Sequence, residues 1–160
     1  MTIAASAAGV LALAGGCGWP AVPTPLRPLA GSPAAGIPTC SATSLAPEVR
    51  DDQGTAGTQR FRVVLTNRST STCTVLGYPV LVLRDADGRL LPPARPSGES
   101  KTVRLDAGRS ASATLTVTPA GCPEVALAST AAVSPPGSGH STKLPVQIPV
   151  CRPLISPVAG

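Results

Sequence analysis

The five cysteines of this 160-residue chain divide into one and four, and this division constrains its fold more than any other feature. Cys17 directly follows an apolar N-terminal stretch. The other four bracket the part of the sequence that carries folding patterns: Cys40, Cys73, Cys122 and Cys151. An even set of cysteines in a short exported sequence is typical of a disulfide framework, which forms in an oxidising compartment. We therefore expect an exported chain with a small domain held by two disulfides.

The N-terminus has the pattern of a signal peptide, expected over residues 1–16. Residues 3–14 are all apolar or small (IAASAAGVLALA). This length suits the apolar region of a signal peptide and is too short to span a bilayer. Met1 and Thr2 provide no positive side chain, although a signal peptide usually begins with one. The apolar stretch nevertheless predicts export.

The sequence around Cys17 offers two modes of export. Ala14–Cys17 (AGGC) resembles a bacterial lipobox, at which the cysteine receives a diacylglyceryl group and fatty acids such as palmitate. Lipidation uses the Cys17 thiol and explains the odd cysteine count. In the alternative, cleavage after Ala12–Ala14 releases a secreted protein with an unpaired thiol. We favour a lipoprotein on the outer face of the cell membrane, with residues 17–39 as lipid-anchor site and Pro/Ala/Gly-rich tether.

After Cys40 the patterns predict β-strands throughout. Residues 59–67 alternate between apolar and polar positions, and turn residues at 85–88 join two apolar runs as a hairpin. Pro145 and Pro149 place the last strand at a sheet edge. The strands are expected at 59–67, 80–83, 89–91, 102–105, 112–118, 125–133 and 144–150. The predicted fold is all-β: an immunoglobulin-like antiparallel β-sandwich over residues 40–152, followed by a C-terminal tail at 153–160.

The predicted core is almost entirely aliphatic. Aromatic residues make up 2% of the chain, and only Phe61 and Tyr78 fall inside the predicted domain. We expect both to belong to its core. A core of Val, Leu, Ile and Ala buries little area per residue, so disulfides are a natural supplement to its stability.

Hairpin geometry favours one of the three possible pairings of four cysteines. If the strand after Cys40 pairs antiparallel with residues 59–67, Cys40 lies near Cys73. Folding the last two strands about residues 137–138 places Cys151 near Cys122. The predicted disulfides are therefore Cys40–Cys73 and Cys122–Cys151.

Residues 67–79 (NRSTSTCTVLGYP) form a recognisable motif. A strand that ends in Leu-Thr-Asn, a Ser/Thr-rich turn and then C-x-x-L-G-Y-P resembles a family of exported actinobacterial domains, catalogued as domain of unknown function 4232. The order of the four domain cysteines agrees with this resemblance, which covers residues 40–151. It implies secretion or lipid anchoring and a sandwich-like fold, and it implies no reaction. The motif residues are Asn67, Cys73, Gly77, Tyr78 and Pro79.

The motif also has a structural interpretation from its residue types alone. Asn67 and the hydroxyl residues after it suit a turn. Gly77 suits a bulge or a change of sheet, and the Tyr78 hydroxyl is expected to bind backbone at that corner. Asn67 also begins an N-glycosylation sequon, which means little in a bacterial chain.

The residue inventory predicts no enzyme, no cofactor and no metal site. His140 is the only histidine and lies in a Gly/Ser/Pro-rich loop that does not position a catalytic base. Asp85-x-Asp87-Gly88 resembles the start of a calcium loop, but further acidic ligands do not follow, so a hairpin turn is favoured. We therefore predict neither catalytic nor metal-binding residues.

Charge and composition restrict the class of partner. The net charge is +5, but the arginines are scattered and aromatic stacking residues are scarce, so nucleic-acid binding is not expected. We expect a membrane contact through the lipid anchor and an unknown protein or envelope ligand. The predicted function is a non-enzymatic binding or scaffolding domain. The alternative is a secreted inhibitor of an extracellular enzyme that presents residues 119–124 (PAGCPE).

Overall fold

The structure, a computed structural model, describes residues 36–160 except residue 56. The expected signal peptide, Cys17 and nearly all of the expected tether lie outside the described residues. Within the described part, no helix has the length and apolar character needed to cross a bilayer.

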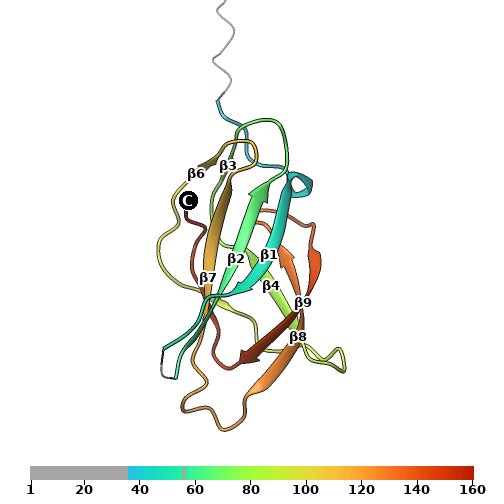
Figure 1. Cartoon of the computed structure of the whole chain (residues 1–160), viewed down its shortest axis with the longest axis vertical. Coiled ribbons are helices and arrows are strands. Elements are labelled where there is room, and N and C mark those ends of the chain that lie inside the picture. Colours follow the sequence, from blue (N-terminus) through green and yellow to red (C-terminus); the bar gives the residue numbers. More distant parts are fainter. Residues whose placement is uncertain (1–35, 56) are drawn as a thin grey trace, which may run out of the picture. The chain divides into compact units, whose positions relative to one another are not determined.

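Five strands form the first sheet, and its three long strands lie near the centre of Figure 1. Adjacent strands in this sheet run antiparallel, except for the last two in the order below, which run parallel. In spatial order the strands are β1 (Leu45–Asp51), β2 (Gln59–Asn67), β7 (Ser110–Val117), β10 (Leu154–Ile155) and β5 (Arg95–Pro96).

Three antiparallel strands form the second sheet, with β8 in the middle. They are β4 (Val80–Arg84), β8 (Ala126–Ser134) and β9 (Thr142–Val150). The predicted edge position of the last strand is confirmed, since β9 carries Pro145 and Pro149 and pairs only with β8. A short ribbon of β3 (Cys73–Val75) and β6 (Val103–Leu105) and a 3₁₀ turn at Ala42–Ser44 complete the domain. The predicted all-β sandwich is confirmed.

Alternating buried residues on the strands build the core between the sheets, and the alternation is regular in β4 and β7. In β7, Ala111, Ala113, Leu115 and Val117 are buried while the residues between them are half-buried. The strand predicted at residues 112–118 is confirmed, and its apolar residues 113, 115 and 117 point inward. Phe61 is buried as expected. Tyr78 is only half-buried at the rim, so the expectation that it belongs to the core was wrong.

Two predicted boundaries differ from the structure. Residues 153–160 are not a tail: β10 pairs with β7 and β5, and Ile155 and Val158 are buried. Residues 89–91 do not form a strand and make only the isolated bridge between Arg84 and Leu90. Pro92 and Pro93 follow at once and lack the N–H groups that a ladder needs, which explains why the hairpin ends there.

Both predicted disulfides are confirmed. Cys40 and Cys73 have Cα atoms 4.8 Å apart, and those of Cys122 and Cys151 are 6.5 Å apart. The first follows from pairing Leu45 with Asn67, which places the entering chain beside β3. The second follows from the pairing of β8 with the end of β9. Each disulfide therefore holds one end of the sandwich.

Candidate binding site

Asn67 organises the end of the sandwich at which the Cys40–Cys73 disulfide lies. Its side chain is fully buried. The amide nitrogen donates to the carbonyl oxygens of Ser71 (2.8 Å), Leu105 (3.2 Å) and Asp106 (3.3 Å). The amide oxygen accepts from the backbone N–H (3.0 Å) and hydroxyl (2.7 Å) of Ser69. A glycan at Asn67 is incompatible with this fold, so the sequon is a coincidence of the turn.

The remaining motif residues also have structural contacts. Gly77 has a φ of +111°, a backbone conformation that a residue with a Cβ rarely adopts, and its carbonyl accepts from Val158 N–H at 2.9 Å. The Tyr78 hydroxyl donates to the Gly98 carbonyl, as the sequence predicts, and Pro79 is fully buried. The motif joins distant parts of the chain, and its contacts point to stability rather than to ligand binding.

A carboxylate beside this network has a perturbed pKa. The Thr72 hydroxyl donates to Asp106 at 2.8 Å, and the Arg104 guanidinium lies 3.1 Å from the same oxygen. The hydrogen bond from Thr72, followed by that from Arg104, holds the pKa of Asp106 below its usual value. On β1, the hydrogen bond from Arg50 likewise lowers the pKa of Glu48. Both carboxylates serve local contacts at the surface.

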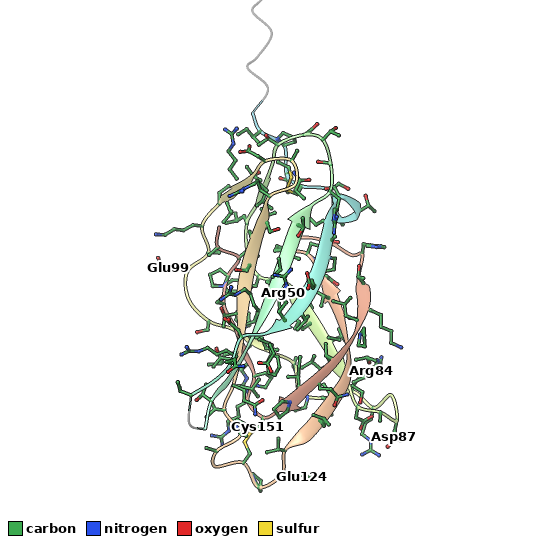
Figure 2. The ribbon with its side chains drawn as sticks, viewed as in Figure 1. Arg50, Arg84, Asp87, Glu99, Glu124 and Cys151 are labelled. Atoms are coloured by element: carbon green, nitrogen blue, oxygen red, sulfur yellow. A yellow bond between two sulfur atoms is a disulfide. The ribbon has the colours of Figure 1, made fainter. Side chains whose placement is uncertain are left out.

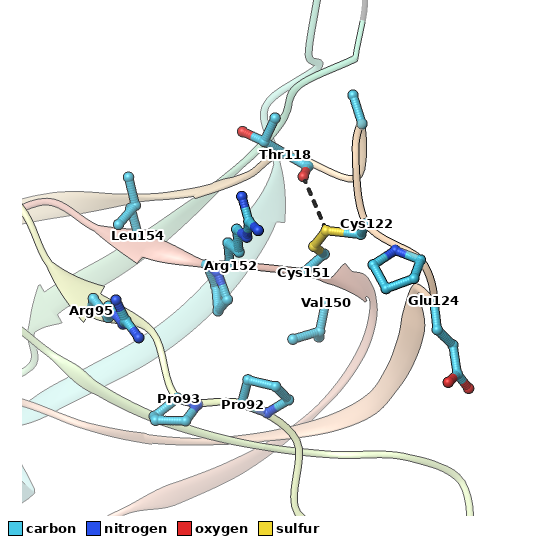
Figure 3. Close-up of a pocket in the computed structure, with 13 residues that line it drawn as sticks. Pro92, Pro93, Arg95, Thr118, Cys122, Glu124, Val150, Cys151, Arg152 and Leu154 are labelled. Carbon is cyan, nitrogen blue, oxygen red and sulfur yellow. Dashed lines mark hydrogen bonds between the residues drawn. A yellow bond between two sulfur atoms is a disulfide. The ribbon is translucent and has the colours of Figure 1, made fainter.

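The opposite end of the sandwich contains a cavity of about 700 Å³, which we call the groove (Figure 3). This volume lies within the range of small-ligand sites. Four segments form it: the chain before β5, the loop after β7, the end of β9 and the start of β10. Its lining residues are Pro92, Pro93, Arg95, Thr118, Ala120, Cys122, Pro123, Glu124, Val150, Cys151, Arg152, Pro153 and Leu154.

The walls of the groove are stiff for covalent reasons. Four of its lining residues are prolines, whose φ is fixed by the ring. The Cys122–Cys151 disulfide joins the loop after β7 to the end of β9. Cys122 N–H also donates to the Pro119 carbonyl at 3.2 Å, which closes a turn. A ligand would therefore meet a preformed surface and pay little ordering entropy.

Two exposed arginines and one exposed carboxylate line this cavity. Arg95 N–H donates to the Pro153 carbonyl at 2.9 Å, which fixes the start of β5 against β10. Figure 3 shows Arg95 and Arg152 on the same side, with Glu124 beyond the disulfide and its carboxylate directed away from them. The ion pairs within residues 36–160, position 56 aside, are Arg50–Glu48, Arg62–Asp52 and Arg104–Asp106. Neither groove arginine takes part in one.

Arg152 has a strained backbone. Its φ of +46° lies in the left-handed region, which among the non-glycine residues described is shared only by Gln53. Such conformations cost free energy for residues with a Cβ and often occur at functional sites. The chain thus bends sharply between the disulfide at Cys151 and the buried Pro153.

The sequence-predicted chemical candidates lie elsewhere and do not meet. His140 is exposed in the β8–β9 loop, where its backbone N–H donates to Ser138 Oγ at 2.9 Å. The Asp85 carboxylate accepts from the N–H groups of Asp87 (3.0 Å) and Arg89 (2.8 Å), so the predicted turn is confirmed. Within the described part of the chain, no three His, Cys, Asp or Glu side chains cluster as metal ligands.

Sequence reasoning found one wall of the groove and missed the rest. The loop at residues 119–124, singled out as a possible inhibitory loop, contributes Ala120, Cys122, Pro123 and Glu124 to the lining. Arg95 and Arg152 were not singled out, because 57 residues separate them and the arginines of this chain are scattered. The sequence does contain a signal for the two arginines, because each lies next to residues that stiffen the backbone. Arg95 follows Pro92-Pro93 closely, and Arg152 lies between Cys151 and Pro153.

The fold and site define a class of small, disulfide-held β-sandwich with a groove at one end. The chain matches the family described as Domain of unknown function (DUF4232) over residues 40–156, and it belongs to that family. The match includes both disulfides, the complete motif and β10. No curated protein and no solved structure matches the sequence.

Proposed function

We propose that this protein is an exported, lipid-anchored envelope protein whose sandwich is a non-enzymatic binding domain, with the groove as its ligand site. The observation that carries the proposal is the groove itself: a stiff cavity of about 700 Å³ with two arginines outside the ion pairs of the domain. Two disulfides support an oxidising location outside the cytoplasm.

The proposed anchor and tether suit a domain held at the cell surface. Cys17 carries the lipid, and Cys40 follows 23 residues later in the sequence. In a polyproline-type conformation such a segment reaches about 70 Å. The chain enters the domain at Gly36–Cys40, beside β3, whereas the groove lies at the other end (Figure 2, where Cys151 and Glu124 mark the groove end). The point at which the chain enters the domain therefore does not obstruct the groove.

The inhibitor alternative receives less support from the loop itself. Peptides that add to a partner's sheet edge are extended over several residues. Residues 119–122 instead form a closed turn, with Gly121 at a φ of +79°. This shape suits the wall of a cavity better than an extended strand for insertion.

Localisation is tested through Cys17. Intact-mass analysis of protein from the membrane fraction is expected to show a diacylglyceryl modification, and Cys17→Ala is expected to release the protein into the medium. A wild-type mature chain in the medium that begins at Gly15 would contradict the anchor and favour free secretion.

The binding role is tested by photocrosslinking on intact cells. A benzoylphenylalanine that replaces Ala120 is expected to capture an envelope component, because Ala120 is exposed and lines the groove. The same probe at Ala86, an exposed residue of the β4 turn outside the groove lining, is the matched control. Equal capture at both positions would refute a specific groove ligand.

The non-enzymatic role is tested at His140. His140→Ala removes an exposed side chain, so we expect an unchanged melting temperature and unchanged ligand capture. Loss of turnover of any substrate in a normally folded His140→Ala protein would overturn this part of the proposal.

A further inference from the structure

We propose that the groove binds an oxyanion, a phosphate or carboxylate group of its ligand, through the guanidinium groups of Arg95 and Arg152. This inference rests on the proposed binding function and gives its ligand a chemical class. Guanidinium is a planar donor that pairs bidentately with carboxylate and phosphate, so two of them on one side of a cavity select for such groups.

The strand register brings the two arginines together although 57 residues separate them in sequence. Arg95 pairs with Leu154 in the parallel β5–β10 ladder, so their Cα atoms lie about 5 Å apart. Arg152 lies two residues before Leu154, in the bend that leads into β10. Both arginines line the cavity, and Figure 3 shows them on the same side of the disulfide, so their long side chains can both reach a ligand held there.

The charge of this pair is not compensated nearby. Glu124 is the single acidic residue of the lining, and its carboxylate points away from both arginines. The three ion pairs of the described residues involve other arginines. Residues 1–35 contain no Asp or Glu, so that segment has no acidic side chain to offer either. Among the described residues, the two guanidinium groups are therefore free to bind an oxyanion of a ligand.

The backbone at Arg152 gives a second, independent reason. Glycine adopts a φ of +46° at lower cost than arginine does, so stability alone favours glycine at this position. Arginine there directs a guanidinium from a rigid bend between Cys151 and Pro153. Strain of this kind is typical of residues held for a ligand.

The rest of the lining limits the ligand further. Pro92, Pro93, Val150 and Leu154 form aliphatic walls, and the lining contains no aromatic ring. A ligand that depends on base or sugar stacking is therefore disfavoured. Because both arginines are exposed, salt will screen their attraction. The inference predicts binding of an oxyanion-bearing chain that weakens steeply as ionic strength rises.

The test is calorimetric titration of the full exported chain with three defined polymers at 50 mM and 500 mM NaCl. Polyphosphate and poly-L-glutamate present the two oxyanions at matched length, and dextran is the neutral control. We expect saturable binding of at least one anionic polymer at low salt and none of dextran. The better of the two identifies phosphate or carboxylate as the source of the oxyanion.

The variants assign the binding to the groove. Arg95→Gln and Arg152→Gln are each expected to weaken binding about 3- to 10-fold. Arg109→Gln is the matched control, because it removes the same charge from an exposed turn at the other end of β7. Equal weakening by all three variants would show general attraction to a basic protein and would overturn the inference, as would the absence of saturable binding.

Arg152→Gly separates ligand binding from structure. It is expected to raise the melting temperature by about 2–5 °C, since it relieves the left-handed strain, while it weakens binding as Arg152→Gln does. A variant that loses binding because it is misfolded would melt lower instead. Retained affinity in Arg152→Gly would contradict a role for the guanidinium.

One further variant distinguishes this inference from the proposed function. Thr118→Trp, in the protein that carries the photocrosslinker at position 120, fills the groove without changing charge. If it abolishes capture of the envelope component while Arg95→Gln and Arg152→Gln leave capture intact, the oxyanion assignment is wrong and the binding role stands. If Thr118→Trp leaves capture intact, the groove is not the site and both fail.

Discussion

The two ends of the sandwich differ in what their polar groups contact. We call them the Asn67 end, with the Cys40–Cys73 disulfide, and the groove end, with the Cys122–Cys151 disulfide. At the Asn67 end the asparagine amide donates to three backbone carbonyls and accepts two hydrogen bonds from Ser69 in the following turn. No buried side-chain polar atom of the described residues lacks a hydrogen-bond partner. At the groove end the polar groups instead line a cavity. Its two exposed arginines, like Arg68 and Arg109 at the Asn67 end, belong to none of the ion pairs among the described residues. The comparison teaches that the family motif lies at the end that holds the fold together, whereas the cavity lies at the other end.

The largest expected effect is the loss of the Asn67 side chain. Asn67→Ala leaves buried carbonyls and a turn N–H without partners, so we expect a loss of about 3–5 kcal/mol in the free energy of unfolding. Urea unfolding measures it. Arg95→Ala at the groove end is the contrasting control and is expected to change stability by less than about 0.5 kcal/mol. Similar losses in both variants would remove the distinction between the two ends.

The next largest effects concern the two disulfides. They should contribute about equally to the stability of the domain but unequally to binding in the groove. Their cysteines are 33 and 29 residues apart, so the chain-entropy argument gives about 3–4 kcal/mol for each. Replacing both members of either pair by Ala should therefore lower stability by similar amounts. Only the Cys122/Cys151 variant is expected to weaken groove binding at a temperature where both remain folded. Equal binding in the two variants would contradict the assignment of the site.

A smaller effect is expected at Tyr78. Tyr78→Phe removes the hydroxyl that donates to Gly98, with an expected loss of about 1 kcal/mol, measured by thermal unfolding. Because the ring is half-buried, Tyr78→Ala should cost less than the roughly 3–5 kcal/mol of a fully buried aromatic. A loss of that full size in Tyr78→Ala would show that the ring is packed more deeply than the structure places it.

The smallest expected effect concerns the pKa of Asp106. Thr72→Val removes the hydrogen bond that most lowers this pKa, so the pKa should rise toward its usual value. Because the folded pKa lies below the unfolded one, the stabilisation exists above the unfolded pKa and is lost as pH falls through the folded value. The difference in the free energy of unfolding between Thr72→Val and the wild type should therefore shrink as the pH falls. NMR titration of the Asp106 carboxyl measures this pKa in both proteins. An unchanged pKa in Thr72→Val would contradict the role given to the Thr72 hydrogen bond.

Features set by local patterns were predictable from sequence. Alternation in residues 59–67 and 112–118 correctly predicted the strands β2 and β7, and the turn residues at 85–88 correctly predicted a turn. Cysteine pairing followed because each disulfide closes a local antiparallel pair. The prediction failed where long-range pairing decides: residues 154–155 are too short to show a period, yet they lie between β7 and β5. The same ladder brings Arg95 to Arg152, so the groove could not be predicted either.

Asn67 shows a different limit of sequence analysis. Its residue type and the hydroxyl residues after it correctly indicated a turn, but the same features fit an exposed turn equally well. Full burial depends on β6 and the turn after it covering Asn67 from 38 and 39 residues away. As a result, Asn67, a polar residue at the end of an apolar strand, makes more side-chain hydrogen bonds than any other of the five motif residues.

The consecutive order of the two disulfides has a kinetic consequence. The first sheet joins segments far apart in sequence, and such topologies fold slowly. Each disulfide, however, connects a cysteine to the next one along the domain. If the chain emerges N-terminus first into an oxidising space, as the proposed export requires, Cys40 and Cys73 can pair before Cys122 and Cys151 emerge. The second pair then forms when the first two domain thiols are already bonded. Oxidation in order of emergence then gives the native bridges without thiol–disulfide exchange, and the slow pairing of the sheet proceeds within loops that are already closed.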